Sequence, residues 1–179
     1  YDLGVPCLLF GAPRRRDGKP AYRIRVCGEA RRVRSQGFDL HVRFGIAELA
    51  RADTVIVPGI DDLRRRVPPR VLAALRSATK RGIRIASICT GSFVLAAAGL
   101  LDGHKVTTHW LGCDELARRF PRLTVDPNVL FVDEGRIVTS AGASAGLDMC
   151  LHLIRRDLGQ AAAATAARIA VAPLSRDGG

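Results

Sequence analysis

The sequence has few features that mark membrane, disulfide-bonded or zinc-binding proteins. No apolar run approaches the ~20 residues that cross a bilayer, and no secretory leader is recognisable in the printed chain. The cysteines are odd in number and scattered, without a CxxC pair, which argues against a disulfide framework and a zinc site. We therefore expect a cytoplasmic protein with free thiols, no bound metal and no cofactor. The five cysteines are Cys7, Cys27, Cys89, Cys113 and Cys150.

Lysine is also scarce. The 28 basic residues include only three lysines, so the net charge of +11 comes almost wholly from arginine. The chain contains no zinc finger, no RNA-binding aromatic motif and no clear recognition helix. We expect a solvated basic surface that attracts DNA weakly and in a salt-dependent way. The arginines lie in short separate groups, at 14–16, 31–32, 64–66, 118–119 and 155–156.

One stretch carries most of the chemical information. A β-branched apolar run, 83–88, is followed by Cys89-Thr90-Gly91 and then by an Ala/Leu-rich run. This pattern predicts a strand, a sharp turn and a helix, with a cysteine at the turn. Unpaired N–H groups at a helix start favour a thiolate and can hold an anion, so Cys89 is a candidate nucleophile. The alternative from position alone is a buried cysteine packed under the helix.

Strands and helices are expected to alternate along the chain. This alternation predicts a doubly wound α/β fold, with a mainly parallel sheet and helices on both faces. Because ligands bind at the carboxyl ends of such strands, the Pro58-Gly59 loop and the Cys89 turn should converge on one pocket. We expect strands at 22–27, 38–42, 53–57, 83–88, 105–109, 123–126, 129–132 and 136–140. We expect helices at 2–10, 68–80, after Cys89, and at 110–120, 144–158 and 160–171, with a polar connection at 28–37.

Both ends of the chain look cut. A parallel α/β domain normally opens with a strand, yet here a helix comes first. We therefore expect one domain, 1–172, whose first strand is missing. The basic segment 173–179 reads as a linker toward a part that is absent.

Few other residues suggest catalysis. The sequence has no GxGxxG, P-loop, HExxH or carboxylate pair. A cysteine nucleophile usually needs a base, and His109, at the end of a predicted strand, could approach the pocket; an ordinary strand-end histidine is the alternative. The small segment 142–146 could let backbone approach a ligand, although close helix packing explains it equally well.

Several motifs, taken in order, resemble those of the ThiJ/PfpI family within the class-I glutamine-amidotransferase-like superfamily. The resemblance covers nearly the whole chain and is closest to the PfpI-like N-terminal domains of AraC/XylS-type transcriptional regulators of the GlxA kind. It implies a flavodoxin-like fold with a cysteine elbow. The motifs are Ser87-Ile88-Cys89-Thr90-Gly91, Leu100-Leu101-Asp102-Gly103, Val106-Thr107-Thr108-His109-Trp110, Arg119-Phe120-Pro121 and 139–148.

The resemblance implies an effector-sensing and dimerisation domain. It would act as a homodimer, bind an unknown small molecule, and reach DNA through a helix-turn-helix domain absent here. Cys89 matches the elbow nucleophile and Gly91 the elbow glycine, while Gly59 matches the loop that donates a backbone N–H. The ligand-binding residues expected on this basis are Gly59, Ile60, Thr90, Gly91, His109 and Gly142.

Two departures from the family pattern argue against turnover. Thr90 stands where the protease-like branch has histidine, which resembles the isocyanide-hydratase branch instead. Leu8 stands where an acid is expected on the first helix, and the alignment gives Asp2 no support as a substitute. Two alternatives stay open beside the regulator. One is a PfpI-type cysteine enzyme (isocyanide hydratase, glyoxalase or amidase-like), and the other is a thiol redox sensor.

Overall fold

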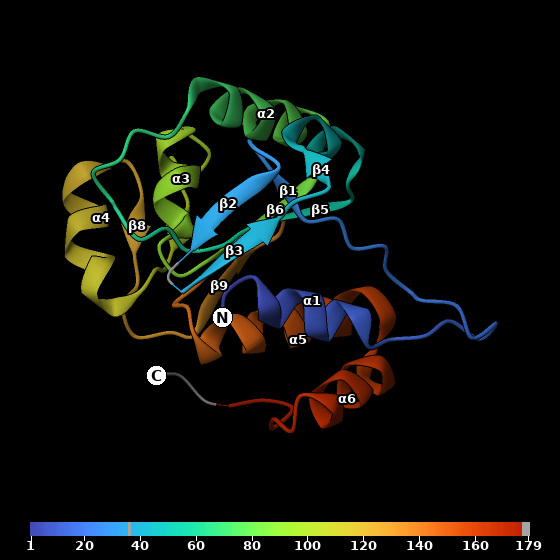
Figure 1. Ribbon diagram of the computed structural model, residues 1–179. Helices are drawn as coiled ribbons and strands as arrows, with labels where there is room; N and C mark the ends of the chain where they lie inside the picture. The colour runs from blue at the N-terminus through green and yellow to red at the C-terminus, as the bar shows by residue number, and fades with distance from the viewer. Residues whose placement is uncertain (36, 177–179) are drawn as a thin grey trace.

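A four-stranded sheet forms the centre of the protein, seen in a computed structural model that describes residues 1–35 and 37–176 (Figure 1). Three strands run parallel and the fourth is an antiparallel edge. The edge arises because β9 and β10 are joined by a tight hairpin at Gly135, which has a φ of +81°. In spatial order the strands are β5 (Thr54–Val57), β6 (Arg84–Ile88), β10 (Ile137–Ser140) and β9 (Phe131–Glu134).

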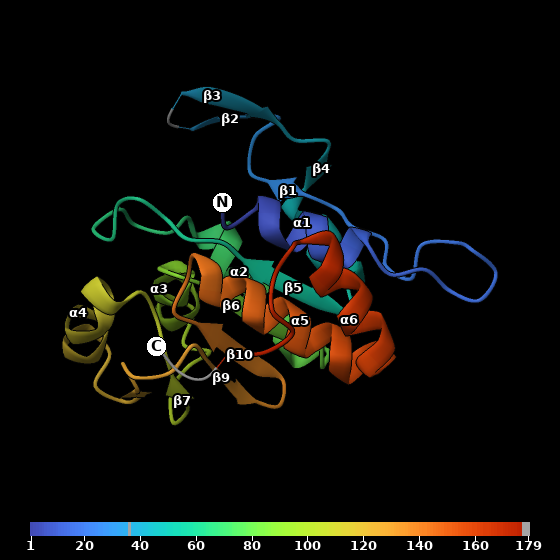
Figure 2. The same cartoon turned by 90° about the horizontal axis from the view of Figure 1, so that it is seen from below.

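Helices cover both faces of this sheet (Figure 2). Successive side chains of β6 point to opposite faces of the sheet. Ile85 packs in the hydrophobic cluster on one face, and Ala86 packs in the cluster on the other. The predicted α/β fold with helices on both faces is therefore confirmed. One face carries α2 (Pro69–Lys80) and α3 (Gly91–Ala97), and the other carries α1 (Gly4–Gly11), α5 (Ser144–Leu158) and α6 (Gln160–Ile169).

A second small region flanks the sheet beyond α3. It contains the short parallel pair β7 (Lys105–Val106) and β8 (Thr124–Val125), with η2 (Trp110–Gly112) and α4 (Cys113–Arg119) between them. The strand predicted at 105–109 is too long, because the Thr107 N–H donates to the side-chain hydroxyl of Thr139 (2.8 Å) rather than to the backbone of a neighbouring strand. The predicted helix 110–120 splits into η2 and α4.

The segment before β5 departs most from the sequence prediction. Residues 22–26 form no strand, and residues 28–37, predicted as a connection, contain β2. β2 pairs with β3, and Arg32 and Asp39 form an ion pair across this hairpin. The segment 28–37 is polar and so lacks the apolar alternation by which a strand is predicted from sequence. Figure 2 shows this hairpin projecting from the body. The elements are β1 (Cys27–Gly28), β2 (Arg32–Ser35), β3 (Phe38–His41), β4 (Phe44–Gly45) and η1 (Ile46–Arg51).

The segment after α6 returns to the body of the domain. Arg176 pairs with Asp148, a carboxylate on α5 that is 5% exposed and so requires a partner. Leu174 packs on the cluster beneath α5. Residues 177–179 of the expected linker lie outside the described residues, and the division at 172 stays a prediction.

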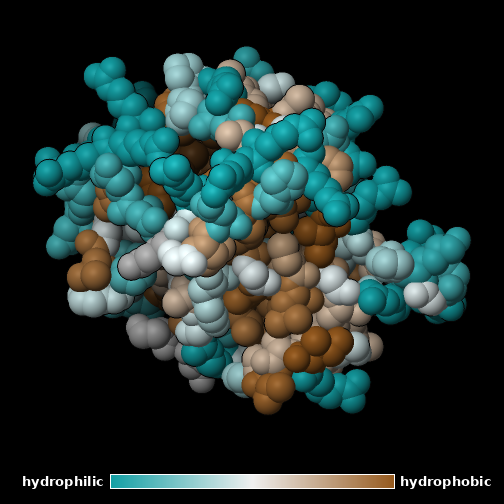
Figure 3. Space-filling model, in the orientation of Figure 1, coloured by the Kyte–Doolittle hydropathy of each residue, from teal (hydrophilic) through white to brown (hydrophobic). Residues whose placement is uncertain are grey.

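The surface combines a broad polar area with an apolar region. Figure 3 shows hydrophilic residues over the side of the hairpin and α2, and hydrophobic residues over α1 and α6, where Leu8 and Ile169 are exposed. Among the described residues, no helix has the length and apolar character needed to cross a membrane.

Candidate functional site

Cys89 occupies the sharp turn between β6 and α3. Its φ of +57° lies in the left-handed region, which costs a non-glycine residue strain. Backbone and hydroxyl contacts hold it there. The Cys89 N–H donates to the Ser140 carbonyl (3.1 Å), and its own carbonyl accepts from the hydroxyls of Thr108 (3.0 Å) and Ser92 (3.3 Å). The predicted strand, turn and helix are therefore present, with the cysteine at the turn.

Two glycines pack directly against this turn. A Cβ at Gly142, where φ is +95°, would lie 2.5 Å from the Cys89 Cβ and 2.9 Å from its Sγ. A Cβ at Gly91 would lie 2.7 Å from the Pro58 carbonyl oxygen. These contacts place the start of α5 and the loop after β5 on either side of Cys89.

The loop after β5 is tied to the Cys89 turn by Thr90. The Thr90 hydroxyl donates to the Ile60 carbonyl and accepts from the Ile60 N–H, both at 2.8 Å. The two loops at strand carboxyl ends therefore meet, as the sequence predicts. The polar groups of Ile60 and Thr90 are already paired with each other, so a ligand would have to compete for them. Their role in ligand binding stays a prediction.

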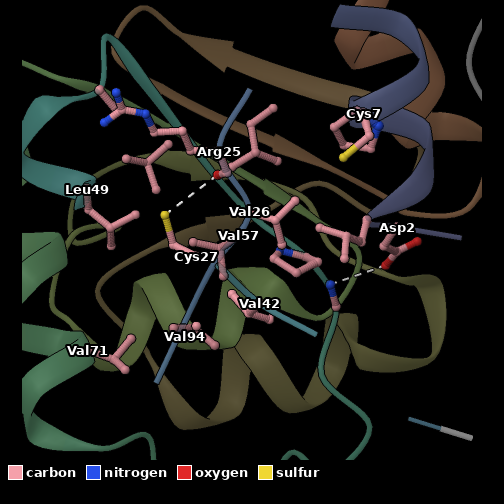
Figure 4. A pocket seen from close by; sticks show the side chains of 18 of the residues that line it. Asp2, Cys7, Arg25, Val26, Cys27, Val42, Leu49, Val57, Val71 and Val94 are labelled. Carbon is pink, nitrogen blue, oxygen red and sulfur yellow. Dashed lines mark hydrogen bonds between the residues drawn. The ribbon is translucent and has the colours of Figure 1, made fainter. Parts of the chain in front are cut away.

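The acid near Cys89 is Asp2, and not a residue at position 8. Leu8 is 50% exposed on the outer side of α1. The Asp2 carboxylate instead accepts from the Gly59 N–H (3.2 Å), as Figure 4 shows, and is close enough to act on the Cys89 thiol. The sequence alignment gave Asp2 no support as a substitute acid, and the structure places its carboxylate near Cys89. Asp2 lies just before Leu3, the N-cap of α1, and its bond to Gly59 joins the start of α1 to the loop after β5.

The surroundings of the Cys89 thiol disfavour its ionised form. Burial raises the pKa of Cys89 above its ordinary value, and the Asp2 carboxylate raises it further. The Thr90 backbone N–H and hydroxyl lower the pKa but do not outweigh burial. The sequence-based expectation of a favoured thiolate considered the N–H groups at the helix start, whereas the structure adds the desolvation of the thiol, which acts in the opposite direction.

Asn in place of Asp2 should make Cys89 more reactive. The change removes the negative charge that raises the pKa of the thiol, so the thiolate fraction at pH 7.5 increases. We expect the rate of iodoacetamide labelling at Cys89, followed by peptide mass spectrometry, to increase several-fold. Asp17→Asn, in the loop after α1, is the matched control and should leave the rate unchanged. An unchanged or lower rate in Asp2→Asn would contradict this electrostatic assignment.

His109 lies near the site without pairing with the thiol. Its Nδ1 accepts from the Leu111 N–H (3.3 Å), which caps η2, and its ring lies 6.0 Å from that of Trp110. His109 and Cys89 line the same cavity. In the described part of the chain, no hydrogen bond joins them. His109 therefore flanks the site, and the chain does not present a preformed cysteine–histidine pair.

The cavity at this site is large, about 2080 Å³, and extends far beyond Cys89. Figure 4 shows Asp2 at one side of it and valine side chains from several elements around it, including Val26, Val42 and Val57. Within residues 1–35 and 37–176, no three His, Cys, Asp or Glu side chains gather as a metal site.

Comparison with known proteins places the chain in a family. The sequence model of the DJ-1/PfpI family matches residues 20–156. The chain belongs to the DJ-1/PfpI family. The HTH-type transcriptional regulator GbdR of Pseudomonas aeruginosa is 35% identical over 126 residues, covering 70% of this chain and 34% of that protein. The isonitrile hydratase of Pseudomonas putida is 38% identical over 91 residues, covering 50% of this chain and 38% of the enzyme.

A solved structure supports the same fold. An AraC family transcriptional regulator from Pseudomonas putida has a TM-score of 0.73 at 23% identity, with 94% of this DJ-1/PfpI chain and 87% of that chain covered. The chain spans about a third of the length of GbdR. The resemblance to the ThiJ/PfpI family and to regulators of this kind is therefore confirmed.

Proposed function

We propose that this chain is the effector-sensing domain of an AraC-type transcriptional regulator, with its small-molecule site at Cys89. The observation that carries the proposal is the match to a helix-turn-helix regulator over 70% of the chain. The converging loops at Asp2, Gly59 and Cys89 supply a place for the effector. DNA binding would belong to a further domain of the parent protein, and we propose a cytoplasmic homodimer that does not turn over its ligand.

The parent reading frame and its DNA binding test this proposal. The full-length protein should contain a helix-turn-helix pair and protect a promoter fragment from DNase I. The chain of residues 1–179 should bind the same fragment weakly, with an affinity that falls steeply as salt increases. A full-length protein without that pair, or tight sequence-specific binding by residues 1–179 alone, would contradict the proposal.

A cysteine hydratase is the second candidate. It is favoured by the Asp2 carboxylate beside Cys89, by Thr90, and by the similarity to isonitrile hydratase. Hydration of an alkyl isocyanide adds one water and gives an N-alkyl formamide. We expect no formamide above the level formed by Cys89→Ser. Formamide production that is lost in both Cys89→Ser and Asp2→Asn would instead establish the enzyme.

The redox alternative is weakened by the raised pKa of Cys89. Peroxide attacks thiolates, and the burial of this thiol beside Asp2 disfavours that form. We expect mild peroxide at pH 7 to oxidise Cys89 no faster than the half-buried Cys7 and Cys27. Peptide mass spectrometry measures the three sites in one sample. Selective oxidation of Cys89 would contradict this expectation and favour the redox sensor.

A further inference from the structure

The segment 23–43, which contains β1, β2 and β3, is strongly basic. It has six arginines and two acidic residues. The acidic residues already have partners, since Glu29 pairs with Arg70 of α2. Asp39 pairs with Arg32 across the hairpin. In the part of the chain that the structure describes, four exposed arginines of this segment form no ion pair, namely Arg23, Arg31, Arg34 and Arg43.

The arginine groups elsewhere on the surface have acidic neighbours that offset their charge. Both arginines at 118–119 pair with Glu115 of the same helix. In the group at 155–156, Arg156 pairs with Asp133. The hairpin therefore differs from these groups in keeping an excess of positive charge. Acidic residues also adjoin the two remaining groups, with Asp17 next to 14–16 and with Asp61 and Asp62 before 64–66.

Strand pairing gathers much of the hairpin charge on one face. Directly opposed residues of an antiparallel pair share a face, as do residues two apart along one strand. Arg32 and Arg34 of β2 therefore point to the same side, with a spacing of about 7 Å along the strand. Asp39 and His41 lie opposite them on that side, and Arg43 extends it where the backbone ladder continues past β3. We call the side with Arg32, Arg34, His41 and Arg43 the basic face.

The other side of the hairpin is apolar, and the hairpin stands away from the domain. Val33 lies opposite Leu40, and Phe38 shares their side. All three line the large cavity. Figure 2 shows β2 and β3 projecting from the body, so a bulky, rigid partner can reach the basic face without meeting the helices.

We propose that the basic face binds the phosphate backbone of duplex DNA. Arginine suits phosphate because its planar guanidinium presents several N–H donors to the oxygens. A two-stranded ribbon also has the right size, since the major groove of B-DNA is about 12 Å wide and admits one. Contacts to phosphate carry no direct sequence information, so the binding is weak, independent of base sequence and dependent on salt.

In the parent protein, this contact would add to the one made by a helix-turn-helix domain. Linking two DNA-binding surfaces makes the second contact intramolecular, so a weak surface raises the overall affinity. The hairpin would then hold the sensing domain against DNA beside the specific site. This role rests on the proposed function, whereas the binding of DNA by the hairpin does not.

The salt dependence of binding measures the phosphate contacts directly. The chain of residues 1–179 would be titrated with fluorescent duplexes of two unrelated sequences, at several salt concentrations, by fluorescence anisotropy. Both duplexes should bind equally. The triple variant Arg32→Ala, Arg34→Ala and Arg43→Ala should bind at least ~10-fold more weakly at low salt. The plot of log affinity against log salt should become less steep by about two to three, because each phosphate contact contributes about 0.9.

Two matched variants separate the basic face from total charge and from folding. The triple variant Arg118→Ala, Arg122→Ala and Arg155→Ala changes the net charge equally at exposed positions on the rest of the domain, and should change the slope by less than about one. The triple variant Arg32→Lys, Arg34→Lys and Arg43→Lys keeps the charge of the basic face, so it should retain most of the slope. Circular dichroism checks that all three variants fold.

Three outcomes would overturn the proposal. Equal losses in the two alanine triples would show that the charge of the whole surface, and not the basic face, attracts DNA. An unchanged slope in the hairpin triple would show that these arginines do not contact phosphate. A change in its oligomeric state, measured by sedimentation, would assign the face to a second copy of the chain. A parent protein without a helix-turn-helix pair would contradict the regulator and leave these slopes unaffected, so the two failures are distinguishable.

Discussion

Alanine at Gly91 should destabilise the protein by ~3 kcal/mol or more. Gly91 opens α3 directly after the Cys89 turn, and its Cα faces the end of β5. A methyl group there would overlap with the Val57 carbonyl oxygen and lie 2.7 Å from that of Pro58. Both atoms belong to backbone, which cannot move aside as a flexible side chain can. Urea unfolding followed by circular dichroism measures the change.

Gly4→Ala is the matched control for this substitution. Gly4 also begins a helix, α1, but a Cβ there meets no atom within 4 Å. Alanine should therefore be neutral or stabilising by up to ~1 kcal/mol, as helix propensity predicts. If Gly91→Ala and Gly4→Ala unfold at the same urea concentration, the close contact between the two loops does not exist.

Loss of the Asp157 carboxylate should also lower the free energy of unfolding substantially. Arg84 donates to both Asp157 oxygens, at 2.8 and 2.6 Å, and the Tyr22 hydroxyl adds a bond of 3.1 Å. The pair joins β6 to α5, with side chains only 15% and 26% exposed. Asp157→Ala would leave the guanidinium without its partner, and we expect a loss of about 2 kcal/mol, since the pair is partly solvated. Asp17→Ala, on an exposed loop, should change stability little.

The ion pair between Arg84 and Asp157 also predicts that the protein becomes less stable as the pH falls. Although burial disfavours its charged form, Arg84 and Tyr22 hold the pKa of Asp157 below its ordinary value. The stabilisation is therefore complete above the unfolded-state pKa and is lost as pH falls through the folded-state pKa. Between pH 6 and pH 2, the wild-type protein should lose more unfolding free energy than Asp157→Ala. Equal losses would contradict this assignment.

Much of the fold could be predicted because its signals are local. The β-branched run before Cys89 and the Ala/Leu-rich run after it are contiguous, so the turn between β6 and α3 follows from a short stretch of sequence. The meeting of the Gly59 loop with that turn follows from a general property of parallel sheets. These two inferences define the candidate site.

What the sequence missed depends on contacts between distant residues. Asp2 reaches the loop at Gly59, 57 positions away, and no spacing rule connects them. The raised pKa of Cys89 depends on burial, to which Gly142 contributes from the start of α5. Residues 22–26 have the alternation of a strand but lack a neighbour to pair with, and pairing is what makes a strand.

Promoter activity in cells tests the central claim most directly. The parent protein and its Asp2→Asn variant would be compared on a reporter promoter that the parent protein binds, across media that differ in their small-molecule nutrients. A sensing site at Asp2 and Cys89 predicts that at least one medium changes wild-type activity several-fold, and that Asp2→Asn loses this response while binding the promoter equally well. A variant that responds as the wild type does, or a parent protein that binds no promoter, would contradict the account.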